Sequence, residues 1–304
     1  MSFPGDAPVA PSVTDRNRVS AAIPAGAVSG HPSVETASGD ADVSPRRLAI
    51  VDEGEVPAPG SFELTSAHAR PRKAFFDESR PIKLSYRFAA SERTGVRVEL
   101  IRKKGRKKVR GWRKRGRLPY TQITRRWNGT EGDGDAANDG IYRFRVGAFG
   151  GPSRAAGSVK LFGYRFPVRG SHGYGGPGER FGAPRSGGRI HQGQDVFAAC
   201  GTPLEAARGG RIQRKAYDPV LYGHYAVIDV TKSPHDHMYV HMASPARFGE
   251  GKRIHTGQRI GRVGRSGNAR SEPCQLHFEL WPHGWRNGNP VDPLPALRRW
   301  DGWS

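Results

Sequence analysis

The sequence predicts an all-β chain in which two folded domains follow a non-globular N-terminal segment. Its 304 residues are only 36% hydrophobic but include 41 glycines and 24 prolines, which favours short strands and many turns over long helices. After residue 65, apolar and polar side chains alternate at a period of two, as in strands buried on one face. Because this periodicity is absent before residue 60, we divide the chain into 1–60, 65–165 and 166–304.

The N-terminal segment, residues 1–60, is rich in proline, serine, alanine, glycine and aspartate, and we interpret it as disordered or linker-like. Residues 1–56 hold 8 acidic and 4 basic side chains, although the whole chain has a net charge of +21. The remainder therefore carries +25. Such a surface attracts polyanions, namely nucleic acid, acidic lipid or acidic polymers of a cell wall, and charge alone does not choose among them.

The middle segment, residues 65–165, is predicted to form a β-sandwich. Its alternating apolar positions are 82, 84, 86 and 88, then 96, 98 and 100, then 142, 144 and 146. Turn pairs such as Asn128-Gly129 separate these runs, as in an all-β sandwich of roughly 100 residues. The stretch 127–146, with its Trp-Asn-Gly, Gly/Asp-rich loop and Gly-x-Tyr-x-Phe strand, resembles the closing hairpin of the Ig-like domain of flagellar hook-capping proteins. The resemblance implies an Ig-like sandwich without catalytic function.

Within this segment, residues 102–117 contain eleven basic side chains and no acidic one. One interpretation is a hairpin that binds polyanions, with anionic polymers of a cell wall as the preferred partner. The other is a solvated, flexible loop, because blocks of like charge are usually mobile. We do not expect nucleic acid as the natural partner, since the aromatic-basic motifs of the common RNA-binding modules are absent.

The last segment holds a candidate metal site. His191 and Asp195 are four residues apart in His191-Gln-Gly-Gln-Asp195, and both residue types are zinc ligands. In the strand-like run 275–280, Leu276, Phe278 and Leu280 share one face, so that His277 projects from the other. Two histidines and one carboxylate, with a fourth position left for water, match a catalytic zinc site.

Residues 166–293 resemble the lysostaphin/LytM type of zinc peptidoglycan endopeptidase. Blocks that carry the resemblance include His191-Gln-Gly-Gln-Asp-Val-Phe197, Tyr239-Val-His-Met242, Leu276-His-Phe-Glu-Leu280 and Asn289-Pro-Val-Asp-Pro293. The resemblance implies a compact antiparallel β-domain with a narrow groove over one zinc ion. It implies that His191, Asp195 and His277 bind the zinc and that His241 polarises water or stabilises the oxyanion. The expected activity is hydrolysis of peptide bonds in peptidoglycan by metal-activated water.

One position departs from the family pattern. Gln275 stands at the position of the first histidine of the family's His-x-His motif. That histidine is the expected general base, and glutamine cannot take up a proton at neutral pH. Because general acid–base help is typically worth about 10²–10⁴-fold, an alternative is a catalytically impaired member that binds the wall or regulates a partner hydrolase. In an active enzyme, other histidines would replace the missing base. His241 could act as the sole proton shuttle, or His235 or His237 could swing into the site.

The remaining expectations concern redox state and location. Cys200 and Cys274 flank the metal motifs, so they form either a disulfide that braces the site or two separate buried thiols. No run approaches the roughly 18 apolar residues of a membrane helix, and no signal peptide is visible. The family resemblance nevertheless implies an extracellular or cell-wall location.

Overall fold

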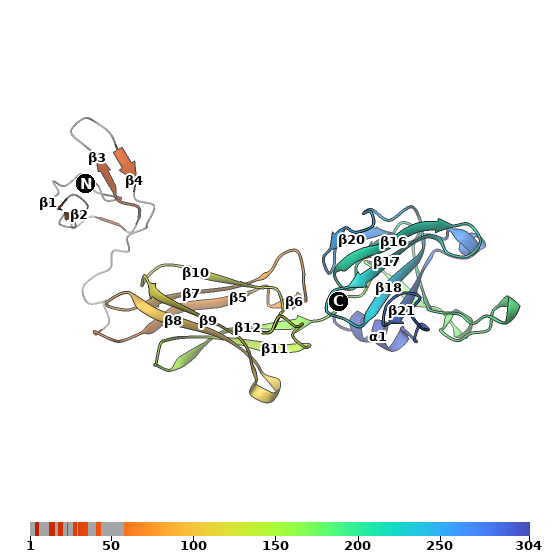
Figure 1. The fold of residues 1–304 in the computed structure, drawn as a ribbon, viewed down its shortest axis with the longest axis horizontal. Coiled ribbons are helices and arrows are strands. Elements are labelled where there is room, and N and C mark those ends of the chain that lie inside the picture. The colour runs from red at the N-terminus through yellow and green to blue at the C-terminus, as the bar shows by residue number, and fades with distance from the viewer. Residues whose placement is uncertain are drawn as a thin grey trace.

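The computed structural model describes residues 58–304 continuously, together with residues 4–5, 12–15, 18–20, 23, 27–28, 30–35 and 41–43. Figure 1 shows two β-rich units lying end to end, with the C-terminus at their junction. Within the described residues α1 (Leu294–Asp301) is the one α-helix, and strands dominate the rest. The predicted all-β fold class is therefore confirmed. No helix of the described residues is long and apolar enough to span a membrane.

The predicted linker 1–60 lies mostly outside the described residues. Its described parts include two short antiparallel pairs, β1 (Ser12–Asp15) with β2 (Arg18–Ser20) and β3 (Ser33–Glu35) with β4 (Ala41–Val43). The disordered or linker-like character of this segment stays a prediction.

The first unit consists of a three-stranded sheet, in the order β10-β7-β5, and a five-stranded sheet, in the order β6-β12-β11-β8-β9. The strands are β5 (Glu63–Arg70), β6 (Lys73–Phe75), β7 (Ile82–Ala89), β8 (Thr94–Arg102), β9 (Lys108–Arg117), β10 (Ile123–Trp127), β11 (Gly140–Ala148) and β12 (Ser153–Phe162). The alternating apolar residues of β7, β8 and β11 are buried in one shared core. Since both sheets contribute an inner face to that core, the unit is a β-sandwich. Its likeness to an Ig-like domain stays a prediction.

The basic segment 102–117 is not a free loop. It comprises the end of β8, the 3-10 turn η2 (Lys104–Arg106) and the whole of β9. β9 is the edge strand of the five-stranded sheet and pairs with β8 alone. Val109 anchors β9 in the sandwich core, and Trp112 packs against that core, so the segment has a defined strand register.

The second unit contains an antiparallel seven-stranded sheet in the order β13-β14-β21-β18-β17-β16-β19, and a separate pair β15-β20. The strands are β13 (His172–Tyr174), β14 (Gln194–Ala198), β15 (Pro203–Glu205), β16 (Gly210–Asp218), β17 (Gly223–Val230), β18 (His235–Met242), β19 (Arg253–Ile254), β20 (Arg259–Arg262) and β21 (Gln275–Pro282). Three further 3-10 turns are η3 (Pro177–Glu179), η4 (Ser186–Gly188) and η5 (Gly267–Ser271). One face of the sheet packs into an apolar core that Leu297 and Trp300 of α1 complete. The opposite face carries a smaller apolar cluster on β17, β18 and β21, and beside it the polar side chains of β14 and β21 line a cavity.

A buried carboxylate joins the two units. Asp77, just after β6, is 7% exposed and accepts a hydrogen bond from Arg253 Nη2 at 2.7 Å. The backbone carbonyl of Asp77 accepts a second one from the Thr256 amide at 3.2 Å. Beside these contacts, Phe162 of the sandwich stacks on Trp303, with ring centroids 4.5 Å apart. The junction thus combines a charged pair with aromatic packing.

We expect Asp77→Ala to lower the free energy of unfolding by about 1–3 kcal/mol, because it removes a charge-assisted hydrogen bond at a buried position. Asp135→Ala is the matched control. Its carboxylate also pairs across the junction, 3.6 Å from Lys232 Nζ, but its side chain is 74% exposed, and such a pair contributes only about 0–1 kcal/mol. Urea unfolding followed by tryptophan fluorescence measures both effects. Equal losses in the two variants would contradict a special role for the buried Asp77 carboxylate, whose partner Arg253 has a side chain that is 42% exposed.

Candidate metal centre

Strand β21 forms the floor of the site, and its two faces differ as the sequence predicts. Leu276, Phe278 and Leu280 are buried in the core of the second unit. His277 and Glu279 point to the opposite face. The period-2 pattern alone therefore directs His277 away from the core.

Pairing with the neighbouring strand brings the predicted carboxylate to His277. Asp195 on β14 lies directly opposite His277 in the antiparallel register. His191 precedes β14 by three residues, and Gly193 makes the close approach to β21 possible. A Cβ at Gly193 would lie 2.4 Å from the Phe278 carbonyl oxygen and 2.8 Å from His277 Nε2. Only glycine fits between the two segments.

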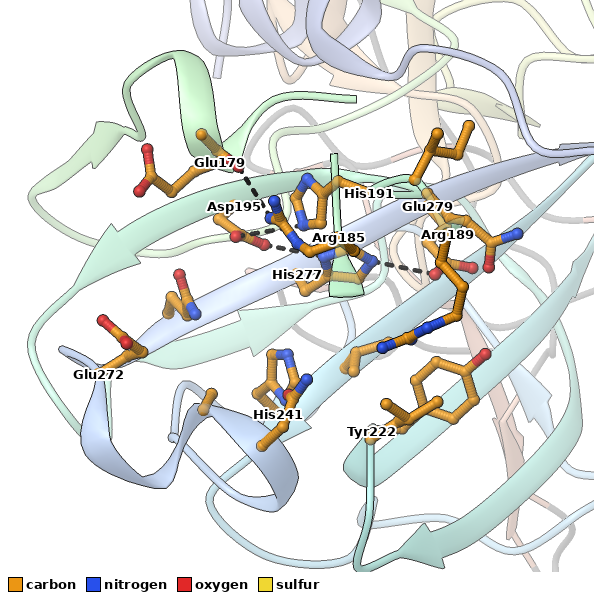
Figure 2. A pocket seen from close by; sticks show the side chains of 18 of the residues that line it. Glu179, Arg185, Arg189, His191, Asp195, Tyr222, His241, Glu272, His277 and Glu279 are labelled. Atoms are coloured by element: carbon orange, nitrogen blue, oxygen red, sulfur yellow. Dashed lines mark hydrogen bonds and ion pairs between the residues drawn. The ribbon is translucent and has the colours of Figure 1, made fainter. Parts of the chain in front are cut away.

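The three predicted ligand residues meet in one cluster. Nε2 of His191 is 3.2 Å from one carboxylate oxygen of Asp195, and Nδ1 of His277 is 2.8 Å from the other. One nitrogen or oxygen atom from each residue lies within 4.8 Å of the other two, and all three side chains are buried (Figure 2). Two imidazole nitrogens and a carboxylate at this separation fit the donor set of a zinc ion.

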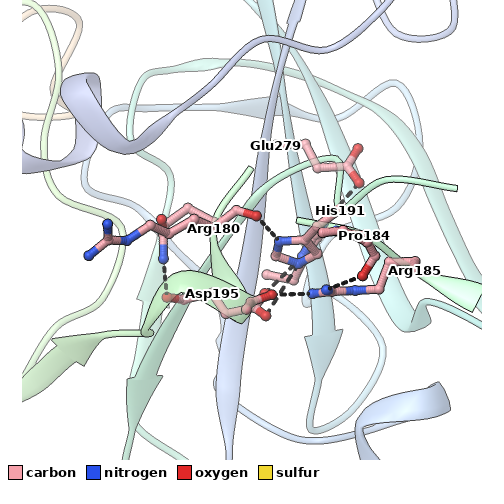
Figure 3. Close-up of polar contacts among 9 residues, drawn as sticks. Arg180, Pro184, Arg185, His191, Asp195 and Glu279 are labelled. Atoms are coloured by element: carbon pink, nitrogen blue, oxygen red, sulfur yellow. Dashed lines mark hydrogen bonds and ion pairs between the residues drawn. The ribbon is translucent and has the colours of Figure 1, made fainter. Parts of the chain in front are cut away.

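Both histidines are oriented through their second ring nitrogen. Nδ1 of His191 donates to the backbone carbonyl of Arg180 at 3.0 Å, which leaves Nε2 facing Asp195 (Figure 3). Nε2 of His277 donates to Glu279 Oε1 at 2.9 Å, which leaves Nδ1 for the cluster. Such contacts fix the tautomer and ring orientation of metal-binding histidines.

Glu279 is the residue that sequence reasoning underestimated. A glutamate that follows a metal ligand on a strand is either a partner of the metal site or, more commonly, an exposed carboxylate, and Glu279 is only 1% exposed. Its second oxygen accepts a hydrogen bond from Trp281 Nε1 at 2.6 Å, so both oxygens have partners. The available signal was its position two residues after His277, which places it on the same face of β21.

The charges of the cluster favour a cation. Burial alone would raise the pKa of Asp195, but hydrogen bonds from His191 and His277 outweigh it and hold the pKa below its ordinary value. Burial would lower the pKa of His277, but its bonds to Asp195 and Glu279 dominate and raise the pKa to about 9. The cluster without metal therefore holds a proton on His277, and binding of a metal ion would displace it.

A β-bulge turns His241 towards the cluster. Between His224 and Ala226 of β17, the pairing register shifts by one residue, so that Val240 and His241 of β18 together oppose Tyr225. His241 has φ of +60°, a left-handed conformation that is uncommon outside glycine. Its Nδ1 donates to the Ser266 carbonyl at 2.9 Å, and its ring centroid lies 5.8 Å from that of His277. Burial, together with the charge of His277, lowers the pKa of His241 to about 4, so the ring is neutral near pH 7.

Gln275 lies at the start of β21, where it pairs with Phe197 of β14. It is 6% exposed and lines the same cavity as His277 and His241. Its Oε1 has no hydrogen-bond partner among the described residues. The amide therefore retains hydrogen-bonding capacity for a water or a substrate group, but no basic function.

The alternative that His235 or His237 swings into the site is wrong. Both precede the bulge on the face of β18 that carries the core residue Tyr239. His237 is fully buried against the rings of Tyr164, Phe278 and Trp300. Burial lowers its pKa to about 3, so His237 stays neutral.

The two cysteines form a disulfide, the first of the two possibilities that the sequence leaves open. Cys200 follows β14, and Cys274 immediately precedes β21, with Cα atoms 5.2 Å apart. The bond closes the 74-residue separation between the two strands that carry Asp195 and His277. It therefore braces the floor of the site.

Above the cluster lies an open cavity of about 410 Å³. Figure 2 shows Glu179 and Glu272 on one side of the cavity and Arg189 and Tyr222 on the other. Arg185 reaches over the cluster and donates to the Gly178 carbonyl at 2.8 Å, which links η3 to the loop before His191. The volume lies within the usual range of ligand-binding cavities, about 300–1,000 Å³.

These features coincide with a known family. The family model described as peptidase family M23 matches residues 189–293, a range that includes the whole cluster, His241 and Gln275. The second unit carries an M23 peptidase domain. The predicted similarity to lysostaphin/LytM-type endopeptidases is thereby confirmed at the level of the domain.

Relatives of the M23 domain are endopeptidases by name. The L-Ala–D-Glu endopeptidase of Bacillus subtilis (strain 168) is 30% identical over 121 residues, which are 38% of this chain and 36% of that protein. Lysostaphin of Staphylococcus staphylolyticus is 30% identical over 111 residues, 36% of this chain and 22% of that protein. This chain thus spans about a third or less of the length of these two relatives. Among solved structures, the catalytic domain of lysostaphin from Staphylococcus simulans is 26% identical, with 42% of this chain and 92% of that one covered and a TM-score of 0.37.

We expect Glu279→Gln to weaken zinc binding by about 10–100-fold, because the amide can no longer hold His277 in the tautomer that the cluster needs. Glu272→Gln is the control, since Glu272 is exposed and lines the same cavity without contacting the cluster histidines. Competition with a chromogenic zinc chelator gives both affinities. Equal affinity in Glu279→Gln and the native chain would contradict the orienting role.

Proposed function

We propose that the M23 domain is a zinc-dependent endopeptidase that hydrolyses peptide bonds of bacterial peptidoglycan. The observation that carries this proposal is the cluster of His191, Asp195 and His277, which lies at the bottom of an open cavity inside the M23 match. The names of the relatives, an L-Ala–D-Glu endopeptidase and lysostaphin, support the choice of peptidase and substrate.

Each residue of the site has a task in this reaction. His191, Asp195 and His277 would hold one zinc ion, which supplies the Lewis-acid chemistry that polarises the scissile carbonyl and activates water. Because Nδ1 of His241 carries the proton that bonds to Ser266, its Nε2 is a free acceptor facing the cavity. His241 would take the proton of the attacking water and deliver it to the leaving amine. Gln275 would donate an amide N–H to the substrate carbonyl or orient the water.

The alternative is a catalytically impaired M23 domain that binds the wall or regulates a partner hydrolase. Gln275 is the observation that favours it, because the site has one neutral histidine beside the cluster where the family pattern has two. The complete cluster and the oriented His241 favour the enzyme. The two possibilities differ in turnover, and not in metal content.

The first test compares the native chain, His277→Ala and Gln275→His on purified peptidoglycan, with metal content determined for each. We expect zinc-dependent release of muropeptides by the native chain, loss of both metal and cleavage in His277→Ala, and faster cleavage in Gln275→His. Mass spectrometry of the products identifies the bond that is cut. Bound zinc without cleavage by the native chain, together with activity in Gln275→His, would establish the impaired alternative.

A second test isolates proton transfer. We expect His241→Ala to retain zinc but to lower kcat for peptidoglycan hydrolysis by about 10²–10⁴-fold, since it removes the one histidine that lines the cavity outside the cluster. Gln275→Ala should lower kcat less, by about tenfold, because it removes hydrogen bonding alone. A His241→Ala variant with native kcat and full zinc content would exclude His241 from catalysis.

The proposal extends to location and to the basic segment. A peptidoglycan endopeptidase works outside the cytoplasm, so we propose an extracellular or cell-wall location. Residues 102–117 would contact anionic polymers of the wall, as their eleven basic side chains suggest. Their position on β9 and η2, within the sandwich, separates this contact from the M23 cavity.

A further inference from the structure

The outward face of the five-stranded sheet is strongly basic well beyond residues 102–117. On β8 and β11 the buried residues alternate with side chains that point away from the sandwich core. The basic members on this face come from three adjacent strands, and they are Arg97, Lys108, Arg113, Arg115, Arg143 and Arg145. The order β11-β8-β9 places them side by side, although they are up to 48 residues apart in the sequence.

Two cavities open on this face, and each has a basic lining. Arg97, Arg113 and Arg115 line the first, together with Phe149 and Gly150. The second is lined by Arg102, Lys103, Arg106, Arg143 and Arg145, with Ile101 and Ser153. Among the residues that the structure describes, no acidic side chain lines either cavity.

The two cavities are neighbours along the sheet. Arg97 of the first cavity lies opposite Gly147 of β11, and Arg145 of the second lies opposite Glu99, which is two residues after Arg97 on β8. Glu99 is the acidic residue between them, and it pairs with Lys108 Nζ at 2.8 Å and with Arg97 Nε at 4.0 Å. Because two basic side chains share one carboxylate, the strip between the cavities keeps a net positive charge.

Several of these arginines are held in place by backbone carbonyls, although Arg97 Nε also lies 4.0 Å from a carboxylate oxygen of Glu99. Arg97 Nη2 donates to the Gly151 carbonyl at 2.6 Å, and Arg102 Nη2 donates to the Asp139 carbonyl at 2.9 Å. Arg145 bonds to the hydroxyl and carbonyl of Ser153. Their side chains are thus ordered while their charges stay available, which is what bidentate recognition of phosphate requires.

We propose that this face of the sandwich binds a linear phosphodiester polymer of the bacterial wall, with successive phosphates in the two cavities. A repeating anion matches two adjacent basic cavities better than a single small anion does. A nucleic acid is less suited, because base stacking needs aromatic platforms and the two linings contribute one aromatic ring, Phe149. This proposal rests on the proposed function only for the choice of a wall polymer as the ligand. The binding itself does not require cleavage of peptidoglycan.

The test measures sedimentation of the full native chain with purified Gram-positive walls on ice, before and after acid extraction of their phosphodiester polymer. We expect extraction to weaken binding at least tenfold. Arg113→Gln/Arg143→Gln removes one exposed arginine from each cavity and should weaken binding to intact walls at least fivefold. It should also lessen the dependence of affinity on salt, because fewer counterions are released.

Lys83→Gln/Arg126→Gln is the matched control. It removes the same charge from an exposed cross-strand pair of the other sheet, where Lys83 of β7 lies opposite Arg126 of β10. We expect this variant to bind intact walls like the native chain. If both double variants lost the same wall affinity, the binding would depend on the net charge of the chain alone, and the proposal would be overturned.

Two further outcomes would also overturn it. One is unchanged binding to extracted walls. The other is tighter binding of the native chain to a DNA duplex than to intact walls at about 0.15 M salt. Cleavage of a soluble cross-linked muropeptide is measured in parallel and should be the same in Arg113→Gln/Arg143→Gln and the native chain. Failure of the native chain to cleave it would count against the proposed function and leave the binding result intact.

Discussion

The site depends on the antiparallel register between β14 and β21. In this register Asp195 lies opposite His277, and side chains at directly opposed positions are close enough to share one ion. The hydrophobic core fixes the same register from the other face, because Val196, Leu276 and Phe278 must all point inward. A slip of one residue would bury His277 and expose the apolar set, so the packing of the core enforces the geometry of the cluster.

The other groups of the site require local departures from regular strand structure. Without the bulge in β18, alternation would place His241 on the core face that carries Tyr239, and His241 could not meet His277. The left-handed backbone at His241 costs of order 1–3 kcal/mol, which the surrounding sheet must offset. Gly193 meets a different constraint, since a Cβ there would lie 2.4 Å from the Phe278 carbonyl oxygen of β21. Both positions lie beside the cluster, as expected where a functional arrangement overrides local preference.

The sequence predicts the parts of this structure that follow from the alternation of apolar residues and from the spacing of residues within motifs. Alternation identified β7, β8, β11 and β21, and the residues of the cluster were found through their motifs. The bulge was not predictable, because it arises from pairing between β17 and β18 and leaves no mark in the order Tyr239-Val-His241. Nor was the burial of Glu279, which depends on a partner, Trp281, on the same strand face. The basic face shows the same limit, since Arg143 and Arg145 join residues 102–117 only through the strand order β11-β8-β9.

Gln275 connects the two functions that we assign to the two units. In the proposed reaction His241 is the one histidine beside the cluster, so each proton transfer would depend on it, and its Nδ1 is already committed to Ser266. A site with slower chemistry gains more from a long residence on its substrate than a fast one does. The proposed binding of the sandwich to a polymer of the same wall would convert each encounter of the M23 domain with peptidoglycan into an intramolecular event at a raised effective concentration. The basic face should therefore matter more for hydrolysis of intact walls than for soluble fragments, and that difference separates a tethered enzyme from a chain whose activity rests on the cavity alone.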